Sequence, residues 1–194
     1  MTAPGRGTAT ALVLVDVQHD FLDRPGLVPD REALCERAVA LLWGWRELGL
    51  PVAHVHTRTL PDGSDRMPHW RATGFTACVA GTRGARPPEG LEPVDGELVV
   101  RKRFYSGFAA PALDAWLRAN AVSSVVVAGL YTHGCVRSTV LDAYERGYEV
   151  RVADDAVATV DVEHGAATRG WLDGRAARFV PVDELLAGLA TPPT

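Results

Sequence analysis

The sequence lacks most of the features that place a chain in a specialised structural class. It has only three cysteines, Cys35, Cys78 and Cys135, in 194 residues. Their odd number and wide spacing fit neither a disulfide framework nor a paired zinc-ligand motif. The apolar run at residues 11–15 is broken by Asp16, so it is too short for a signal segment or a membrane span. We therefore expect a cytoplasmic protein in a reducing compartment.

A strong charge of one sign is also missing. The net charge is -4 and the isoelectric point is about 5.8, and no Lys/Arg-rich stretch with interleaved aromatic residues occurs. Both observations argue against a nucleic-acid partner. Hydrophobic residues make up 47% of the chain, enough for one sizeable core at this length. We expect a single domain over residues 1–194 that acts on a small molecule and has no membrane partner.

What the sequence does contain is an alternation of short β-branched segments with longer segments of helical periodicity. The first segment, "ALVLVDV", is apolar on both faces, as a strand covered by helices on both sides must be. The predicted strands are residues 11–17, 51–57, 96–102, 123–129, 148–153 and 177–182, and the predicted helices are residues 30–48, 110–119, 135–146, 162–172 and 183–189.

This order of elements predicts an α/β protein with a three-layer Rossmann-like fold: a mainly parallel six-stranded sheet with helices on both faces. Only residues 60–93, which are rich in Gly, Pro and Arg, lack a clear periodicity. We expect a long loop there, and long loops in compact domains are commonly functional.

Three reactive side chains follow the predicted strands. Asp16 lies at the carboxyl end of the first strand, Lys102 ends the third, and Cys135 follows the fourth after a short turn. Ligands of such sheets bind outside the carboxyl ends of the strands. We therefore expect the three side chains to meet at one edge of the sheet.

Together these three groups suit acyl transfer through a thioester. A helix N-terminus and a nearby ammonium, that of Lys102, both favour the thiolate form of Cys135. Asp16 can accept the thiol proton and return it to a leaving amine, and backbone N–H groups freed at the turn can hold an oxyanion. Each residue alone has a simpler interpretation: a buried apolar Cys, a solvated Lys and a capping Asp. Their convergence favours catalysis.

Three motifs in this order resemble those of the isochorismatase-like cysteine hydrolases, which include nicotinamidases, N-carbamoylsarcosine amidohydrolases and biuret hydrolases. The motifs are "LVDVQHDFL" around Asp16, "VVRKRFYSGF" around Lys102 and "GLYTHGCVRSTVLDAYERGYEV" around Cys135. The resemblance implies an Asp16, Lys102 and Cys135 triad on a Rossmann-like sheet. It also implies a cis peptide between Leu130 and Tyr131, an oxyanion hole built from the N–H groups of Tyr131 and Cys135, and a homo-oligomer, either a dimer or a tetramer.

The metal site typical of nicotinamidases has no counterpart in the sequence. The corresponding positions are Thr59, Pro61 and Ala77, and none of these side chains offers the carboxylate or imidazole that such a cation needs. His54 and His56 share one face of the second predicted strand, which fits either ligation or hydrogen-bonded interior residues. We predict no metal and no cofactor.

The turn before the nucleophile keeps two chemistries open. True isochorismatases resemble "GLYTHGC" at Tyr131 and His133 but carry Gly at the position of Cys135, and they cleave a vinyl ether by means of the Asp. The thiol favours hydrolysis of an amide, carbamoyl or ureido C–N bond. Vinyl-ether hydrolysis and a non-catalytic pseudo-hydrolase remain the alternatives.

Several residues are candidates for substrate contacts, although each has packing or a subunit contact as an alternative role. Trp70 can stack on a planar group while Arg71 holds a carboxylate, and Arg137 is a further possible anion ligand. The candidate substrate-binding residues are Phe21, Arg58, Trp70, Arg71, Tyr105, Phe108 and His133.

Overall fold

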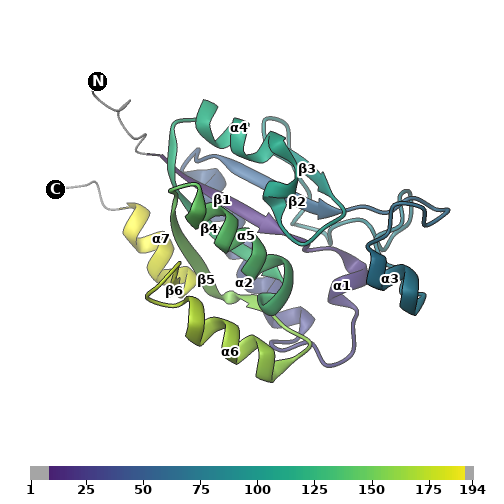
Figure 1. Cartoon of the computed structure of the whole chain (residues 1–194). Helices are drawn as coiled ribbons and strands as arrows, with labels where there is room; N and C mark the ends of the chain where they lie inside the picture. Colours follow the sequence, from purple (N-terminus) through teal and green to yellow (C-terminus); the bar gives the residue numbers. More distant parts are fainter. Residues whose placement is uncertain (1–8, 191–194) are drawn as a thin grey trace.

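The computed structural model describes residues 9–190 of the chain, and the predicted domain extends beyond this range at both ends. Its six strands form one sheet in the order β3-β2-β1-β4-β5-β6 (Figure 1). Every pairing within this sheet is parallel. The strands are β1 (Ala9–Val15), β2 (Val52–Thr57), β3 (Leu98–Lys102), β4 (Val122–Leu130), β5 (Glu149–Ala158) and β6 (Arg178–Val180).

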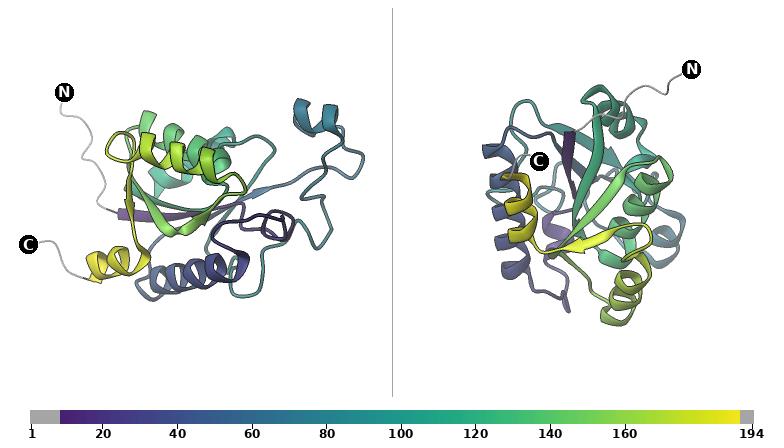
Figure 2. Two further views of the ribbon diagram at one scale, coloured as in Figure 1. Left: turned by 90° about the horizontal axis from the view of Figure 1, so that it is seen from below. Right: turned by 90° about the vertical axis from the view of Figure 1, so that its left-hand side faces the viewer.

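Helices cover both faces of this sheet, which confirms the predicted three-layer fold. Helices α2 and α7 lie on one face, and α4, α5 and α6 lie on the other (Figure 2). The helices are α1 (His19–Leu22), α2 (Arg31–Glu47), α3 (Pro68–Thr73), α4 (Pro111–Ala119), α5 (Arg137–Glu145), α6 (Val162–Leu172) and α7 (Val182–Ala190), with a 3-10 turn at Gly107–Ala109 and a π-helical turn at Thr132–Val136.

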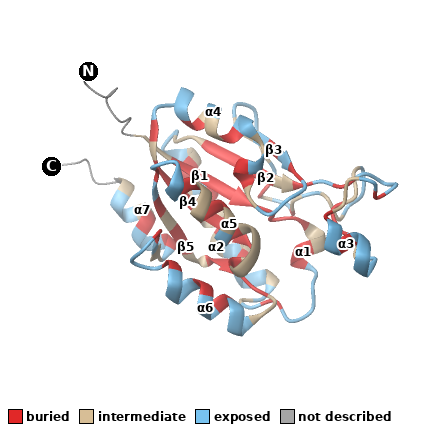
Figure 3. Cartoon of the chain, in the orientation of Figure 1, coloured by how far each residue is buried: buried red, intermediate tan, exposed pale blue. Residues whose placement is uncertain are grey.

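The apolar side chains of β1 divide between two cores. Leu12 and Leu14 pack into the core beneath α2, whereas Ala11, Val13 and Val15 pack into the core beneath α4 and α5. All five side chains are at most 2% exposed. The strands of the sheet are largely buried, whereas the helices are exposed on their outer faces (Figure 3). Burial on both faces explains why this strand has a continuous apolar run instead of an alternating one.

The register of the sheet brings several strand ends to one edge. Thr57 of β2 pairs with Lys102 of β3, and Val15 of β1 pairs with Val55 on one side and Gly129 on the other. The strand order reverses between β1 and β4, so this edge lies at the topological switch point where ligands bind in open α/β sheets. Helices α1 and α3 lie beyond this end of the sheet (Figure 1).

The structure corrects some predicted boundaries. Residues 60–93 are not wholly loop, because Pro68 begins the short helix α3, which ends at Gly74 in the left-handed region (φ 71°). Strand β1 stops at Val15 instead of residue 17, because Asp16 has a φ of 55°. Cys135 lies in the π-helical turn before α5 and not at the first position of that helix.

No helix among residues 9–190 is long and apolar enough to cross a membrane. The cytoplasmic location and the homo-oligomer stay predictions.

Candidate active site

Asp16 is a fully buried carboxylate at the end of β1, and its lone pairs are used by three donors. Oδ1 accepts hydrogen bonds from the backbone N–H of Thr57 (2.8 Å) and from its hydroxyl (2.9 Å). Oδ2 accepts from Lys102 Nζ at 2.6 Å. A buried carboxylate costs much less free energy when it is paired and hydrogen-bonded in this way.

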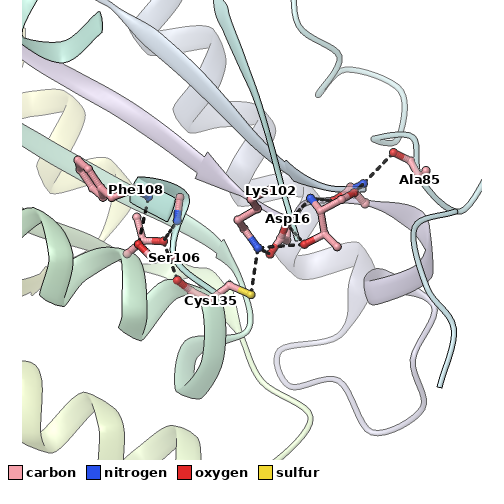
Figure 4. A network of polar contacts seen from close by, with 10 residues as sticks. Asp16, Ala85, Lys102, Ser106, Phe108 and Cys135 are labelled. Carbon is pink, nitrogen blue, oxygen red and sulfur yellow. Dashed lines mark hydrogen bonds and ion pairs between the residues drawn. The ribbon is translucent and has the colours of Figure 1, made fainter. Parts of the chain in front are cut away.

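Lys102 joins the carboxylate to the thiol. Its Nζ lies 2.6 Å from Asp16 Oδ2, 2.9 Å from Thr57 Oγ1 and 3.3 Å from Cys135 Sγ. In Figure 4 the lysine nitrogen lies between the carboxylate and the sulfur. Burial alone would lower the pKa of Lys102, but the Asp16 carboxylate and Cys135 outweigh burial and raise that pKa above its usual value. The ammonium therefore stays charged at neutral pH.

The Cys135 thiol lies in the turn between β4 and α5. Burial raises the pKa of this thiol above its usual value and the Asp16 carboxylate raises it further, while Lys102 opposes both effects. Burial and the carboxylate therefore favour the protonated thiol, in contrast to the thiolate that a helix start and a lysine alone predict. Asp16 is the carboxylate that shares Lys102 with this thiol.

Backbone geometry at the end of β4 brings this turn close to Asp16. Gly129 has a φ of 116°, and a Cβ at this position would lie 2.0 Å from the carbonyl oxygen of Val15, so only glycine lets the two strands approach here. The peptide bond between Leu130 and Tyr131 is cis. The Tyr131 carbonyl then accepts hydrogen bonds from the N–H groups of Gly134 (2.9 Å) and Val136 (3.2 Å), which closes the turn.

Two residues that the sequence analysis did not single out hold Asp16 in place. Thr57 donates to Asp16 Oδ1 from both its N–H and its hydroxyl, and this hydroxyl also accepts from Lys102 Nζ. Gln18 fixes Thr57 in turn. Gln18 Nε2 donates to the carbonyls of Thr57 (2.9 Å) and Ala85 (2.8 Å), and its Oε1 accepts from Thr57 N–H (2.8 Å). The signal was present in the sequence: Thr57 ends a predicted strand at the ligand-binding edge, and Gln18 follows Asp16 by two residues.

A cavity of about 630 Å³ opens beside Cys135. Four of the predicted substrate-binding residues line it: Phe21, Trp70, Tyr105 and His133. The rest of its wall is largely aromatic and apolar, with rings from Phe75, Phe104 and Tyr131 among others. Such a cavity suits a small ligand with a planar or apolar part.

Two arginines also line this cavity. The Arg24 guanidinium lies over the Phe75 ring, 4.9 Å from its centroid, and Arg137 follows Cys135 by two residues. The sequence indicates Arg137 as an anion ligand but not Arg24, because the loop of Arg24 carries no periodic signal.

Three other predicted substrate contacts lie elsewhere. Arg58 lines two different cavities but not that of Cys135. Arg71 is exposed and does not line the Cys135 cavity, although its neighbour Trp70 does. Phe108 is buried in the core beneath α4 and α5, where its ring lies 6.1 Å from that of Tyr148. Because none of these three side chains lines the Cys135 cavity, we do not propose them as substrate contacts.

The structure gives His54 a protein partner. Its Nε2 lies 2.7 Å from Glu97 Oε2, and within residues 9–190 no group of three or more His, Cys, Asp or Glu side chains is arranged to hold a metal ion. Burial lowers the pKa of His54, although Glu97 opposes the shift. This contact agrees with the hydrogen-bonded interior alternative for His54.

Comparison of the chain with known proteins identifies its family. The family model described as isochorismatase domain matches residues 10–180. The chain belongs to the isochorismatase family. This confirms the resemblance that the three motifs indicated.

Relatives within the isochorismatase family include enzymes named for amide hydrolysis. The chain is 31% identical over 157 residues to a maleamate amidohydrolase from Pseudomonas putida, covering 79% of this chain and 74% of that protein. It matches the solved structure of an N-carbamoylsarcosine amidase from Thermoplasma acidophilum with a TM-score of 0.77 and 30% identity, covering 91% of this chain and 98% of that one. These names agree with the prediction of a hydrolase that acts on C–N bonds.

An isochorismatase-family structure from Desulfovibrio vulgaris matches the fold more closely. The TM-score is 0.84 at 31% identity, with 94% of this chain and 99% of that chain covered. The whole layered architecture is therefore shared, not only the strands around Asp16, Lys102 and Cys135.

Proposed function

We propose that this protein hydrolyses the C–N bond of a small amide, carbamoyl or ureido compound through a covalent thioester on Cys135. One observation carries the proposal: Lys102 Nζ contacts both Asp16 Oδ2 and Cys135 Sγ, and Cys135 lines a cavity. A nucleophile, a base and a cation that fixes both are the parts that covalent acyl transfer requires.

The first half of the proposed reaction forms the thioester. Asp16 takes the proton of the Cys135 thiol as the sulfur attacks the carbonyl carbon. The family resemblance implies that the N–H groups of Tyr131 and Cys135 hold the oxyanion that develops. The N–H groups of Gly134 and Val136 already donate to the Tyr131 carbonyl. Asp16 then gives the proton to the leaving nitrogen, the C–N bond breaks, and ammonia or an amine departs.

The second half releases the acid. Water attacks the thioester carbon while Asp16 accepts its proton, the C–S bond breaks, and the proton returns to the sulfur. Lys102 stays protonated throughout and balances the negative charge that moves between the carboxylate and the sulfur.

The arginines of the cavity support a substrate that also carries an anionic group. Arg24 and Arg137 both line the wall, and guanidinium groups bind carboxylates with paired, charge-assisted hydrogen bonds. We propose that the substrate places its C–N carbonyl at Cys135 and a carboxylate near Arg137.

A hydrolysis screen tests the proposal. The wild type is incubated with primary amides, ureas and carbamoyl amino acids, with and without a carboxylate, and ammonia release is measured. We expect turnover of at least one carboxylate-bearing amide and none by Cys135→Ala, with both proteins melting at similar temperatures. Turnover by Cys135→Ala at the wild-type rate would reject the mechanism.

Vinyl-ether hydrolysis remains the second candidate, because Tyr131 and His133 match the isochorismatase pattern and their rings are stacked (centroids 6.0 Å apart, 5° between planes). Isochorismate is included in the screen for this reason. Under this alternative Asp16→Ala abolishes cleavage of isochorismate, whereas Cys135→Ala tolerates it.

A further inference from the structure

His133 is a titratable side chain close to Cys135 that has no role in the proposed mechanism. It precedes Cys135 by two positions and lines the same cavity. Its imidazole ring is half-buried and stacked on Tyr131. The proposed mechanism does not use this ring, although it has two nitrogens that can form hydrogen bonds.

The hydrogen bonds of Thr159 determine which nitrogen of His133 carries the proton. His133 Nδ1 lies 2.5 Å from Thr159 Oγ1. The same hydroxyl lies 2.9 Å from the carbonyl oxygen of Asp161, which can only accept, and it accepts a bond from Asp161 N–H at 3.2 Å. A hydroxyl has one proton. If that proton pointed to His133, two oxygen atoms would face each other at 2.9 Å without a hydrogen between them. Nδ1 is therefore the donor.

Thr159 itself is fixed by its neighbours. Its backbone exchanges two hydrogen bonds with Val28, at 2.8 and 2.9 Å. Its side chain packs against Gly165 of α6, where a Cβ would lie 2.7 Å from Thr159 Cγ2. Asp161 caps the same helix by accepting from His164 N–H at 3.0 Å. The acceptor for His133 is thus part of the rigid junction between β5 and α6.

The second nitrogen of His133 is left as an acceptor. Burial lowers the pKa of His133, with Asp161 opposing and His164 adding to the shift, so the ring is neutral at pH 7. A neutral ring protonated at Nδ1 has a lone pair on Nε2, and no residue of the described range 9–190 bonds to that atom. The two charged side chains that line the cavity, Arg24 and Arg137, can only donate.

We propose that His133 is a specificity residue whose Nε2 accepts a hydrogen bond from an N–H group bonded to the scissile carbonyl. Primary amides and ureido compounds have such a group, and esters of the same acid do not. The inference rests on the proposed function, because it assigns a substrate contact at the same cavity. Such a contact would favour cleavage of a C–N bond over a C–O bond in this cavity.

The tautomer can be tested without any substrate. Two-bond proton–nitrogen NMR spectra of the nitrogen-labelled protein distinguish a protonated ring nitrogen from a bare one, and loss of one signal set in His133→Gln assigns His133. We expect a protonated Nδ1 and a bare Nε2. In Thr159→Val, which removes the hydroxyl at nearly constant shape, we expect this pattern to be lost, and in Thr159→Ser to be kept. A wild-type ring protonated at Nε2 would overturn the proposal.

The role in specificity needs a matched pair of substrates. The probes are the amide with the highest kcat/KM in the screen and the methyl ester of the same acid. In His133→Phe, which keeps a ring on Tyr131 but has no acceptor, we expect kcat/KM to fall about tenfold more for the amide than for the ester, the size of one hydrogen bond to a neutral group. His133→Gln, which keeps an acceptor, should show a smaller amide-specific fall in kcat/KM than His133→Phe. Thr159→Val should show part of the same fall, and Thr159→Ser should show none of it.

Each result separates this proposal from the proposed function. An equal loss for amide and ester in His133→Phe would overturn the specificity role while leaving thioester chemistry intact, because a purely structural change affects both substrates. Absence of amide hydrolysis by the wild type would overturn the proposed function and the role of His133 with it, whichever tautomer the spectra show.

Discussion

Two buried charged networks lie on neighbouring strands, and only one of them resembles an active site. In the first, Lys102 joins Asp16 to Cys135. In the second, Glu97 is held by Arg46 from α2 (Nε to Oε1, 2.8 Å) and by His54 from β2 (Nε2 to Oε2, 2.7 Å). Both contain a carboxylate, a cation and a third polar group. Buried charge by itself therefore does not identify catalysis.

The networks differ in what their polar atoms face. Glu97 Oε2 also accepts from Arg46 Nη2 (3.0 Å) and from Val94 N–H (3.0 Å), so protein donors surround that carboxylate. None of Arg46, His54 and Glu97 lines the cavity of Cys135. The first network has the Cys135 thiol at the cavity wall, while the second joins α2 to the segment before β3. We infer a catalytic role for the first and a structural one for the second.

The largest expected effect comes from breaking the first network at its centre. Lys102→Met leaves the Asp16 carboxylate buried without its cation, and we expect the free energy of unfolding to fall by about 3–5 kcal/mol. Amide turnover should be lost as well, because the cation that contacts both the carboxylate and the sulfur is then missing. Denaturant unfolding and ammonia release measure the two effects. A stable variant with full turnover would contradict the role of Lys102.

Breaking the second network should affect stability alone. Glu97→Gln removes the charge that Arg46 and His54 share, and we expect a loss of about 1–3 kcal/mol in the free energy of unfolding, with kcat/KM within about threefold of the wild type. The same two assays apply. If turnover fell as far as in Lys102→Met while the protein stayed folded, the distinction between the two networks would be wrong.

A smaller effect, on KM, is expected from replacing an arginine of the cavity. For carboxylate-bearing amides we expect Arg137→Gln to raise KM about tenfold with little change in kcat, the effect of losing one charge-assisted contact made in both ground and transition states. Arg71→Gln is the matched control, since Arg71 does not line the cavity. Equal KM values for the two variants would show that Arg137 does not hold the anion.

The smallest effect concerns His56, whose ring lies 5.9 Å from that of His54. Burial lowers the pKa of His56 to about 4, with the His54 charge adding to the shift. The unfolded chain protonates near the ordinary pKa of 6.5, whereas the folded protein does so only near 4. Unfolding therefore takes up a proton in this window, and stability falls as the pH is lowered from about 6.5 to 4.

Substitution isolates this contribution. We expect His56→Gln to flatten the fall in stability between pH 6.5 and 4. Denaturant unfolding at a series of pH values provides the measurement. Parallel curves for wild type and His56→Gln would show that His56 titrates alike in both states.

The fold and the residues at the strand ends could be predicted from the sequence. Asp16, Lys102 and Cys135 could be placed together from the sequence because apolar runs mark where buried strands stop, and parallel strands stop at the same edge. The fold followed from the same alternation of strands and helices.

Side-chain direction outside regular elements was not predictable. Trp70 and Arg71 are neighbours, yet only Trp70 lines the cavity, because the short helix α3 has no apolar periodicity that fixes its orientation. Phe108 belongs to a 3-10 turn packed into the core. The bond from His133 to Thr159 joins residues 26 positions apart through a turn whose shape no local pattern specifies.

The most direct test of the central claim is to look for the covalent intermediate. The wild type is mixed with the best amide of the screen, quenched in acid within the first turnovers, and analysed by intact-protein mass spectrometry and peptide mapping, with hydroxylamine trapping of any released acyl group in parallel. The account predicts the mass of the acyl group on the peptide that contains Cys135, and no such mass in Cys135→Ala. Steady hydrolysis with no acyl group on Cys135, no trapped acyl product and undiminished turnover by Cys135→Ala would contradict it.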